Sequence, residues 1–545
     1  MPKNNISYIT ISTTFMKTQA RALLFILVSG ILFLSGYLIP ANAQLYRWTG
    51  GVNNTWEQNG NWSTAGFPNS NNAIPYFFNT ITTPTTITLG IPVQSRIVLF
   101  NDNFAYTISG AGSIQLDTAG AGGTVILGVL NSAGNAAHTV NVPISLNNDN
   151  LTILNQANQV FTINGTLNNN GNAINVQGAA TGNIAISGII SGGGSLNKFS
   201  TNTLTLSGAN TYSGLTTINA GIIDVQNASA LGSSAAGTVV TNNATLELSL
   251  TGFNTIAGEA LSITGTGTSG QGALHNDSGT NIWTGNVTLT GNAEITVDSG
   301  TILAFSNNTI NLGANTLTVD ANGASGLIGT STITGTGNFV KNGSNTWHFI
   351  GGSNTYTGTT TVNSGTLRLG VAGGTSVPGN IVVNGGTVLW TSNEQIANSS
   401  NMTLNSGTLN LNGADETLGT LTLSSTSSVN FGSGSSILTF ADSSATSWGG
   451  SAEMWLFNWS GSDTGGGTDQ LIFSSAGLTA TQLGQIYFVN PAGFAPGVYH
   501  SKFIGSEVVP AVPEPSTIIA GGLVLLILGW RERKRIKSIL QSIIH

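Results

Sequence analysis

The chain has 545 residues, and its 14 basic and 21 acidic residues make up only 6% of them, against roughly 25% in an average soluble domain. It contains no cysteine, which excludes a disulfide scaffold and a thiol-ligated zinc site. Between residues 44 and 530, acidic residues outnumber basic ones by fourteen, so charge gives no reason to expect nucleic-acid binding.

The first apolar segment has the form of an export signal. Residues 22–39 are almost entirely apolar. Two basic residues precede this run and two small residues follow it: Lys17 and Arg21, then Ala41 and Ala43. We therefore expect residues 1–43 to be a secretory signal peptide, which uses the Sec machinery and is cut by signal peptidase after Ala43. Met16 is an alternative start, and an uncleaved anchor is the alternative interpretation because the run approaches the length of a membrane span.

Residues 44–79 are rich in tryptophan, with Trp48, Trp56 and Trp62 close together. Exposed indole rings can bind sugar faces through apolar contact, whereas buried ones would cover the open first coil of a repeat. We interpret this segment as an N-terminal cap module and keep sugar binding as the alternative.

Residues 80–445 consist of short alternating strands separated by Gly, Asn and Ser. Four of these segments read Thr-Leu-x-Leu and begin at Thr203, Thr245, Thr366 and Thr408. One side chain in two is apolar, so each strand can bury one face, and no segment shows a capped helical period. The pattern predicts an all-β fold, a right-handed parallel β-helix whose coils bury inward residues and stack Asn, Ser and Thr into ladders.

Two stretches of this region repeat without a gap. Residues 208–221 align onto residues 352–365, both contain Asn-Thr-Tyr, and Lys198 and Lys341 lie just upstream. The stretches resemble the autotransporter-associated β-strand repeat, also called the passenger-associated transport repeat. This resemblance implies β-helical coils and carries no implication of catalysis.

Residues 446–505 begin with a second aromatic cluster. It contains Trp448, Trp455, Phe457 and Trp459. We interpret the segment as a C-terminal β module that closes the solenoid. Its glycine-rich run ending at Asp469 partly matches the nonapeptide of calcium-binding β-rolls. Such a site needs adjacent turns to share the ion, and one imperfect copy is present, so we expect a plain turn before a strand.

The C-terminal segment, residues 506–545, contains three signals in order. They are Val512-Pro513-Glu514-Pro515-Ser516, an apolar run that we predict as a transmembrane helix over residues 516–530, and the basic residues Arg531, Arg533, Lys534 and Arg535. A basic cluster of this kind stays on the cytoplasmic side. The order resembles the PEP-CTERM sorting signal. That resemblance implies an exosortase-type protease, transient anchoring in the inner membrane, and delivery to the cell envelope or outside; an ordinary tail anchor is the alternative.

Motifs for catalysis or metal binding are missing from the sequence. The five histidines lie far apart, and there is neither a phosphate loop nor a nucleophile elbow with a base. Asp415 and Glu416 are the one adjacent acidic pair, which we expect at a solvated turn. A polysaccharide-degrading β-helix would need two carboxylates from different coils to meet. We predict no catalytic residue, no cofactor and no metal.

These features predict a non-enzymatic, exported, structural or adhesin-like β-helical protein of the cell surface or extracellular matrix. Beyond the export and sorting machinery, its hydroxyl and amide side chains suit weak multivalent contacts with extracellular polysaccharide. The alternatives are a polysaccharide-binding or polysaccharide-degrading β-helix, and a surface-layer component that binds no ligand.

Overall fold

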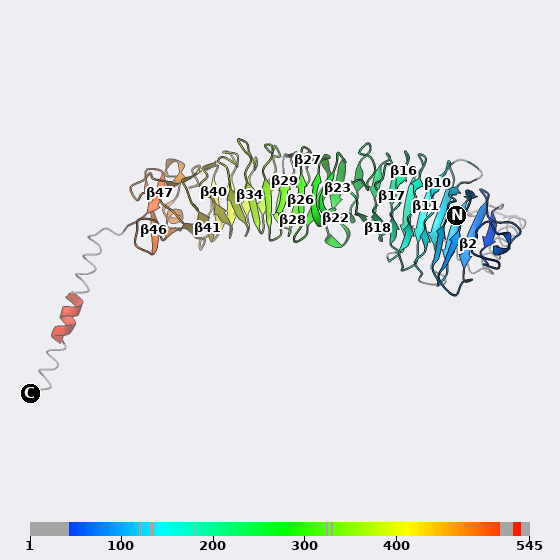
Figure 1. Cartoon of the computed structure of the whole chain (residues 1–545). Helices are drawn as coiled ribbons and strands as arrows, with labels where there is room; N and C mark the ends of the chain where they lie inside the picture. The colour runs from blue at the N-terminus through cyan, green and yellow to red at the C-terminus, as the bar shows by residue number, and fades with distance from the viewer. Residues whose placement is uncertain are drawn as a thin grey trace, which may run out of the picture. The chain divides into compact units, whose positions relative to one another are not determined.

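The computed structural model of the chain describes residues 43–118, 120, 122–130, 136–179, 181–322, 325–328, 331–512 and 527–535 (Figure 1). Strands dominate these residues, in which α-helix is confined to α2 (Ala480–Leu483) and to residues 527–535. The chain forms two compact units, Met1–Thr296 and Val297–His545. The expected all-β architecture is confirmed, because strands stack as a parallel β-solenoid in both units.

Three parallel sheets organise the coils of the first unit. The first sheet begins with β1 (Gln44–Arg47) and continues through β2 (Ala73–Phe78), β5 (Ile97–Asn101), β8 (Thr124–Val129), β11 (Asn150–Asn155), β14 (Ile174–Gly178), β17 (Leu196–Lys198), β19 (Thr216–Ile218), β21 (Thr238–Val240) and β23 (Leu261–Gly265). The second contains β3 (Thr85–Thr88), β6 (Tyr106–Ser109), β9 (Thr139–Val140), β12 (Phe161–Ile163), β15 (Ile184–Ile186), β18 (Thr203–Leu206), β20 (Gly221–Val225), β22 (Ala244–Ile256) and β24 (Leu274–Trp283). The third contains β4 (Val93–Ser95), β7 (Ile114–Leu116), β10 (Ile144–Leu146), β13 (Leu167–Asn168) and β16 (Ile190–Ser191).

Apolar ladders form the interior of the coils. Ile186, Leu206, Val225 and Leu248 lie in register on four successive strands of the second sheet, and each is at most 1% exposed. The intervening Thr205 faces outward. Burial of stacked apolar side chains contributes about 25 cal/mol per Å² removed from water. A chain with so few charged residues therefore obtains its stability from these ladders rather than from ion pairs.

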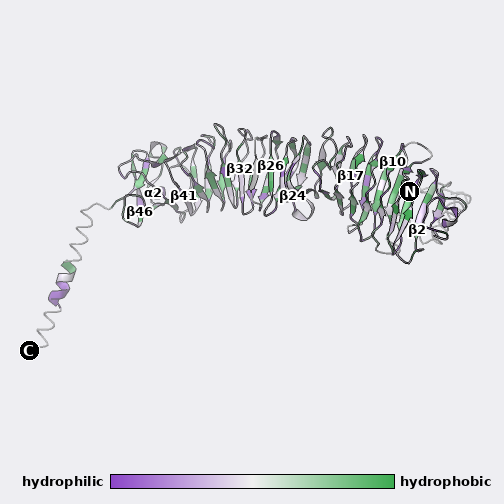
Figure 2. Ribbon diagram, viewed as in Figure 1, coloured by the Kyte–Doolittle hydropathy of each residue, from purple (hydrophilic) through white to green (hydrophobic). Residues whose placement is uncertain are grey.

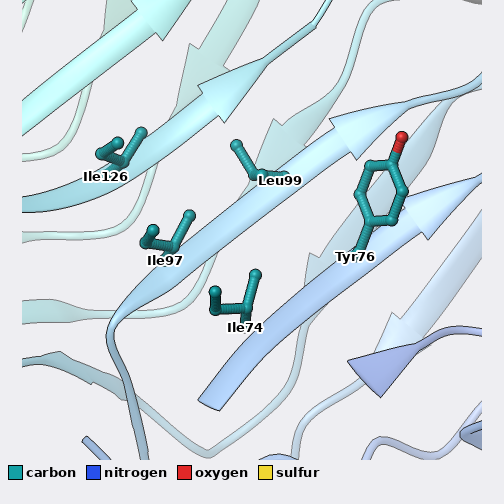
Figure 3. Close-up of a cluster of buried hydrophobic side chains, with 5 residues drawn as sticks. All are labelled: Ile74, Tyr76, Ile97, Leu99 and Ile126. Atoms are coloured by element: carbon teal, nitrogen blue, oxygen red, sulfur yellow. The ribbon is translucent and has the colours of Figure 1, made fainter. Parts of the chain in front are cut away.

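The first coils are apolar on their outer face as well. The outward side chains of β2, β5 and β8 form a cluster in which each residue is only 2–7% exposed: Ile74, Tyr76, Ile97, Leu99 and Ile126 (Figure 3). Ala43 and Leu45, at the start of the described chain, pack against this cluster. On the inner face of the same strands, Phe77 and Phe100 stack with ring centroids 5.1 Å apart. These strands are thus buried on both faces.

The second unit repeats the arrangement of stacked parallel sheets. One sheet contains β32 (Thr346–Phe349), β34 (Thr366–Leu369), β36 (Thr387–Trp390), β38 (Thr408–Asn410), β41 (Ser427–Asn430), β43 (Met454–Phe457) and β45 (Ile486–Val489). A second sheet contains β28 (Leu317–Ala321), β31 (Phe339–Asn342), β33 (Thr360–Val362), β35 (Ile381–Val383), β37 (Met402–Asn405) and β40 (Leu421–Ser425). Another contains β39 (Glu416–Leu418), β42 (Ser436–Phe440) and β44 (Asp469–Phe473).

Antiparallel strands end the parallel stack of the second unit (Figure 1). β46 (Val498–Ile504) pairs antiparallel with β45 and with β47 (Glu507–Pro510), and β47 pairs antiparallel with β44. An open sheet edge is a site of unwanted strand pairing. The reversal of direction covers the edge that the last parallel coil would expose.

The expected amide ladder is present on the outside of the second unit. Nδ2 of Asn363 donates to Oδ1 of Asn342 at 2.8 Å, Asn384 donates to Asn363 at 2.8 Å, and Asn405 donates to Asn384 at 2.9 Å. Each asparagine amide is thus hydrogen-bonded to the asparagine of the neighbouring coil. Such a ladder fixes the register of the stack without any charge.

Candidate functional site

The predicted sorting and cleavage residues lie partly outside the described chain. Val512 follows β47 and is exposed, and Ala43 is the first described residue. Outside the described residues lie Ala41, Pro513, Glu514, Pro515 and Ser516.

Residues 527–535 form a helix that includes the whole basic cluster. Along this helix the side chains change from apolar to hydrophilic (Figure 2). Trp530 is exposed, and Nζ of Lys534 lies 3.7 Å from the centroid of its ring. Arg and Lys are good helix formers, so the helix does not stop where the apolar run stops.

The predicted transmembrane helix over residues 516–530 is not supported by the structure. Its overlap with the described helix covers residues 527–530 alone. In the part of the chain that the structure describes, no helix combines the length and the apolar character needed to cross a membrane.

Lys198 and Lys341, which precede the two repeat copies, point into the interior of their coils and are fully buried. Nζ of each lysine donates to carbonyl oxygens of its own turn, and also to one in the next coil: Ala220 at 3.4 Å for Lys198 and Ser364 at 3.3 Å for Lys341. Burial lowers the pKa of Lys198 to about 7 and that of Lys341 to about 8. Each lysine therefore ties two successive turns together.

The asparagine of each Asn-Thr-Tyr sequence joins three coils. Oδ1 of Asn210 accepts from the backbone N–H of Ile190 at 2.8 Å, and its Nδ2 donates to the carbonyl of Ala230 at 2.6 Å. Asn354 makes the same two kinds of bond at 2.9 and 2.8 Å. Both side chains are buried. Sequence reasoning noted this motif as a repeat but did not assign its asparagine this bridging role.

Glycine and tyrosine complete each repeat. Tyr212 and Tyr356 are fully buried, and each hydroxyl lies 2.6 or 2.5 Å from the threonine hydroxyl four residues later. Gly221 and Gly365 have φ of +71° and +62°, and a Cβ at either position would approach a carbonyl oxygen of the preceding coil to 2.4 Å. Only glycine fits there. The repeat is therefore a device for stacking coils.

The N-terminal tryptophans pack against one another rather than facing solvent. Trp48 and Trp56 are fully buried, and the ring centroid of Trp62 lies 5.0 and 5.1 Å from theirs. Phe77 of β2 lies beneath all three rings at 5.7–6.0 Å. Rings enclosed in this way have no open face for a sugar to stack on.

Glu416 is not at a solvated turn, and that expectation is wrong. The side chain is buried at the start of β39. Its Oε2 accepts from Nε1 of Trp390 at 2.5 Å and from the N–H of Gln395 at 2.8 Å, while Oε1 accepts from the N–H of Ile396 at 3.2 Å. Burial raises the pKa of this carboxyl group to about 7. Coil packing, which a local sequence pattern does not show, places this side chain inside.

Asp469 uses both carboxylate oxygens within the protein. Oδ1 accepts from the N–H of Ser436 at 3.1 Å, and Oδ2 accepts from the N–H and hydroxyl of Ser460 at 2.8 and 2.6 Å. The glycine-rich run before it leads into β44, as expected of a plain turn before a strand. The Asp469 carboxylate therefore links the chain at Ser436 to the chain at Ser460.

One column of ionisable side chains crosses adjacent coils of the first unit. Asp224, Glu247 and His275 lie in register on β20, β22 and β24. Nδ1 of His275 lies 3.0 Å from Oε2 of Glu247, and Asp224 accepts from Thr205 at 3.2 Å and from Gln226 at 2.8 Å. Burial is the main cause that raises the pKa of Asp224. Sequence reasoning did not place these residues together, because register between coils decides it.

Comparison with known proteins agrees with these features. Residues 196–225 and 339–369 match the passenger-associated-transport-repeat family, and residues 511–534 match the PEP-CTERM protein-sorting motif. The chain carries a PEP-CTERM sorting motif and passenger-associated transport repeats. Each matched repeat contains the buried lysine, the bridging asparagine and the required glycine described above. The resemblance read from the sequence is confirmed for both elements.

A curated protein is similar to part of the chain. The Adhesin BmaC autotransporter of Brucella suis biovar 1 (strain 1330) is 32% identical over 267 residues, which is 48% of this chain. The chain spans only 6% of the length of that relative. No solved structure matches the chain.

Proposed function

We propose that the chain is an exported, non-enzymatic, adhesin-like protein that presents its β-solenoid at the cell surface or in the extracellular matrix. The observation that carries this proposal is the PEP-CTERM motif at residues 511–534, directly after a parallel β-solenoid. Similarity to an adhesin over 48% of the chain supports the contact role. The hydrogen-bonding roles of Glu416 and Asp469 within the fold support a protein without catalysis.

The order of events in export follows from the two ends of the chain. The Sec machinery would export the precursor, and signal peptidase would cut after Ala43. At the other end, Pro513, Glu514 and Pro515 lie in the matched PEP-CTERM motif. An exosortase-type protease would then remove the tail, and the chain would leave a transient position at the inner membrane.

The experiment replaces Pro513, Glu514 and Pro515 with alanine in the producing bacterium. We expect export to continue and tail removal to stop, so that a full-length form accumulates in the membrane fraction. Immunoblots of fractionated cells measure both outcomes. The control is Ser506→Ala, because Ser506 lies in a turn and outside the matched motif. Val508, Val509 and Pro510 are unsuitable as control positions because they lie in β47.

Two results contradict the proposal. If the triple-alanine chain is trimmed and released like the parent, Pro513, Glu514 and Pro515 are not the signal for tail removal, and the proposed sorting route is wrong. If cells that lack the chain adhere to surfaces and to one another as well as parental cells do, the adhesin-like role is wrong even though sorting is right.

A further inference from the structure

The outer face of the second unit changes chemistry at its last coils. One column of outward side chains runs in register through the parallel strands and on to the antiparallel β46: Thr346, Thr366, Thr387, Thr408, Ser428, Trp455, Tyr487 and His500. Five hydroxyl residues are thus followed by three aromatic ones. The core does not require this change, because Met454 and Leu456 on the inner face of β43 are already fully buried.

The aromatic side chains of this column form a partly exposed stack. The rings of Trp455 and Tyr487 are 5.2 Å apart and inclined by 22°, and His500 lies 4.9 Å from Tyr487. Nε1 of Trp455 donates to Oε2 of Glu453 at 3.0 Å, which fixes the orientation of the indole. The rings are therefore held in place before any ligand binds, and preorganised groups bind with a smaller entropic cost.

The neighbouring outward column is also apolar at this end. Phe457 lies next to Trp455 on β43 and is 37% exposed, and Val498 on β46 is 55% exposed. We call the set Trp455, Phe457, Tyr487, Val498 and His500 the aromatic platform. Exposed apolar groups gathered in this way mark an interaction site rather than ordinary surface.

The residue that precedes Trp455 in the column is too small to cover the facing side of the indole ring. Ser428, the residue in register with Trp455 on the preceding coil, is much smaller than an indole ring. Beyond it, the hydroxyl groups of Ser428 and Thr408 lie 2.9 Å apart, one coil spacing along the same column. A ligand stacked on Trp455 would therefore extend over a row of hydroxyl groups. Apolar ring faces edged with hydroxyl groups are the chemistry of a pyranose chain.

Size and charge decide between the partners that such a platform could take. A stable protein interface needs about 800 Å² and 20–30 residues from each partner, which these few side chains do not provide. Acidic residues outnumber basic ones by fourteen between residues 44 and 530, and the Glu453 carboxylate lies beside the ring, so a polyanion is disfavoured. We propose that the aromatic platform binds a neutral polysaccharide. This inference rests on the proposed surface location and gives its contact role a ligand class.

The test uses the full chain, purified from the producing bacterium, and affinity electrophoresis in gels that contain hydroxyethylcellulose or galactomannan. We expect Trp455→Thr and Tyr487→Thr each to weaken retardation by about tenfold in polysaccharide concentration. Threonine continues the residue type of the preceding coils, so the melting temperature should change little. Trp455→Phe keeps an aromatic face and should retain most of the binding.

Phe253→Ala is the matched control. Phe253 lies on β22 of the first unit and is 71% exposed, but it belongs to no aromatic stack in the described residues. Its loss should leave retardation unchanged. Equal retardation of the parent, Trp455→Thr and Tyr487→Thr would overturn the proposal. A parent chain that binds neither polysaccharide would also overturn it. The same holds if Trp455→Thr leaves retardation unchanged but reduces self-association in sedimentation experiments, because the platform would then bind a second copy of the chain.

Failure of this inference is distinguishable from failure of the proposed function. A chain that is sorted and released but binds no polysaccharide removes the ligand assignment and leaves the surface location. A chain that binds polysaccharide in gels but never leaves the cell supports the ligand assignment and contradicts the proposed surface location.

Discussion

Nε1 of Trp390 and Oε2 of Glu416 are joined by a hydrogen bond of 2.5 Å between side chains that are both buried. The bond spans 26 residues of sequence, about one coil. It leaves a carboxyl group in the interior, where the charged form is disfavoured by burial. Stability of this region must therefore depend on pH.

Glu416→Gln tests that dependence. The pKa of Glu416 is about 7 in the folded chain, against 4.5 for an ordinary glutamate, so the folded state binds more protons between these values. The contribution of Glu416 to the free energy of unfolding is therefore fully present below pH 4.5 and is lost as pH rises through 7. Glu416→Gln should remove this fall, and should cost about 1–3 kcal/mol at acid pH because an amide group faces backbone donors. Thermal melts from pH 4 to 8 measure both; the exposed Glu394→Gln is the control, and an unchanged pH profile in Glu416→Gln contradicts the assignment.

The two buried lysines predict a second pH dependence of opposite sign. Their pKa values of about 7 and about 8 lie below the usual 10.5, so the unfolded chain binds more protons in this range. Stability should rise as pH increases from 7 to about 10. The double variant Lys198→Met, Lys341→Met should abolish most of this rise, while Lys502→Met should not. Chemical denaturation at several pH values is the measurement, and a rise that persists in the double variant would show that other groups cause it.

Leu206→Asp should be among the most damaging substitutions in the first unit. Leu206 lies between Ile186 and Val225 in a dry ladder, and a carboxylate there would lack both water and a partner. We expect a loss of more than about 4 kcal/mol, or failure to fold. Thr217→Asp, on an outward position of β19, should change the midpoint of denaturation far less. Equal effects of the two variants would show that inward and outward positions are wrongly assigned.

Circular dichroism tests the fold as a whole. In the described residues between 43 and 512, α-helix is confined to α2 (Ala480–Leu483). The far-ultraviolet spectrum of the exported chain should therefore be dominated by β structure. Typical globular domains contain roughly 30–35% helix, and a measured helix content above about a quarter would falsify the solenoid.

Deleting residues 531–545 tests the role of the basic cluster separately from the protease signal. Basic side chains after an apolar run resist transfer across the membrane. Without them we expect weaker retention, so unprocessed chain should appear in the culture medium. Immunoblots of the medium at matched cell density measure this. Retention equal to the parent would mean that the apolar run alone holds the chain.

Local features of the sequence were enough to predict the fold class and both repeat elements. Thr203–Leu206 and Thr366–Leu369 became strands with buried leucines, because alternation of apolar and polar residues acts over two residues and needs no distant partner. The PEP-CTERM motif was identified in the same way, since its three elements are contiguous in residues 511–534.

Residues whose role depends on another coil could not be assigned from the sequence. Glu416 was expected in solvent, and Trp455 was grouped with Trp459 although the structure buries only Trp459.

The sequence by itself determined that this chain stacks short strands and carries a PEP-CTERM motif over residues 511–534, because those properties are local. Tertiary structure alone decided the partners of Lys198, Asn210 and Glu416, and it aligned Ser428, Trp455 and Tyr487 in one column. The physical reason is register. Each coil has its own number of residues, and only the hydrogen bonds between coils set which side chains lie one above another.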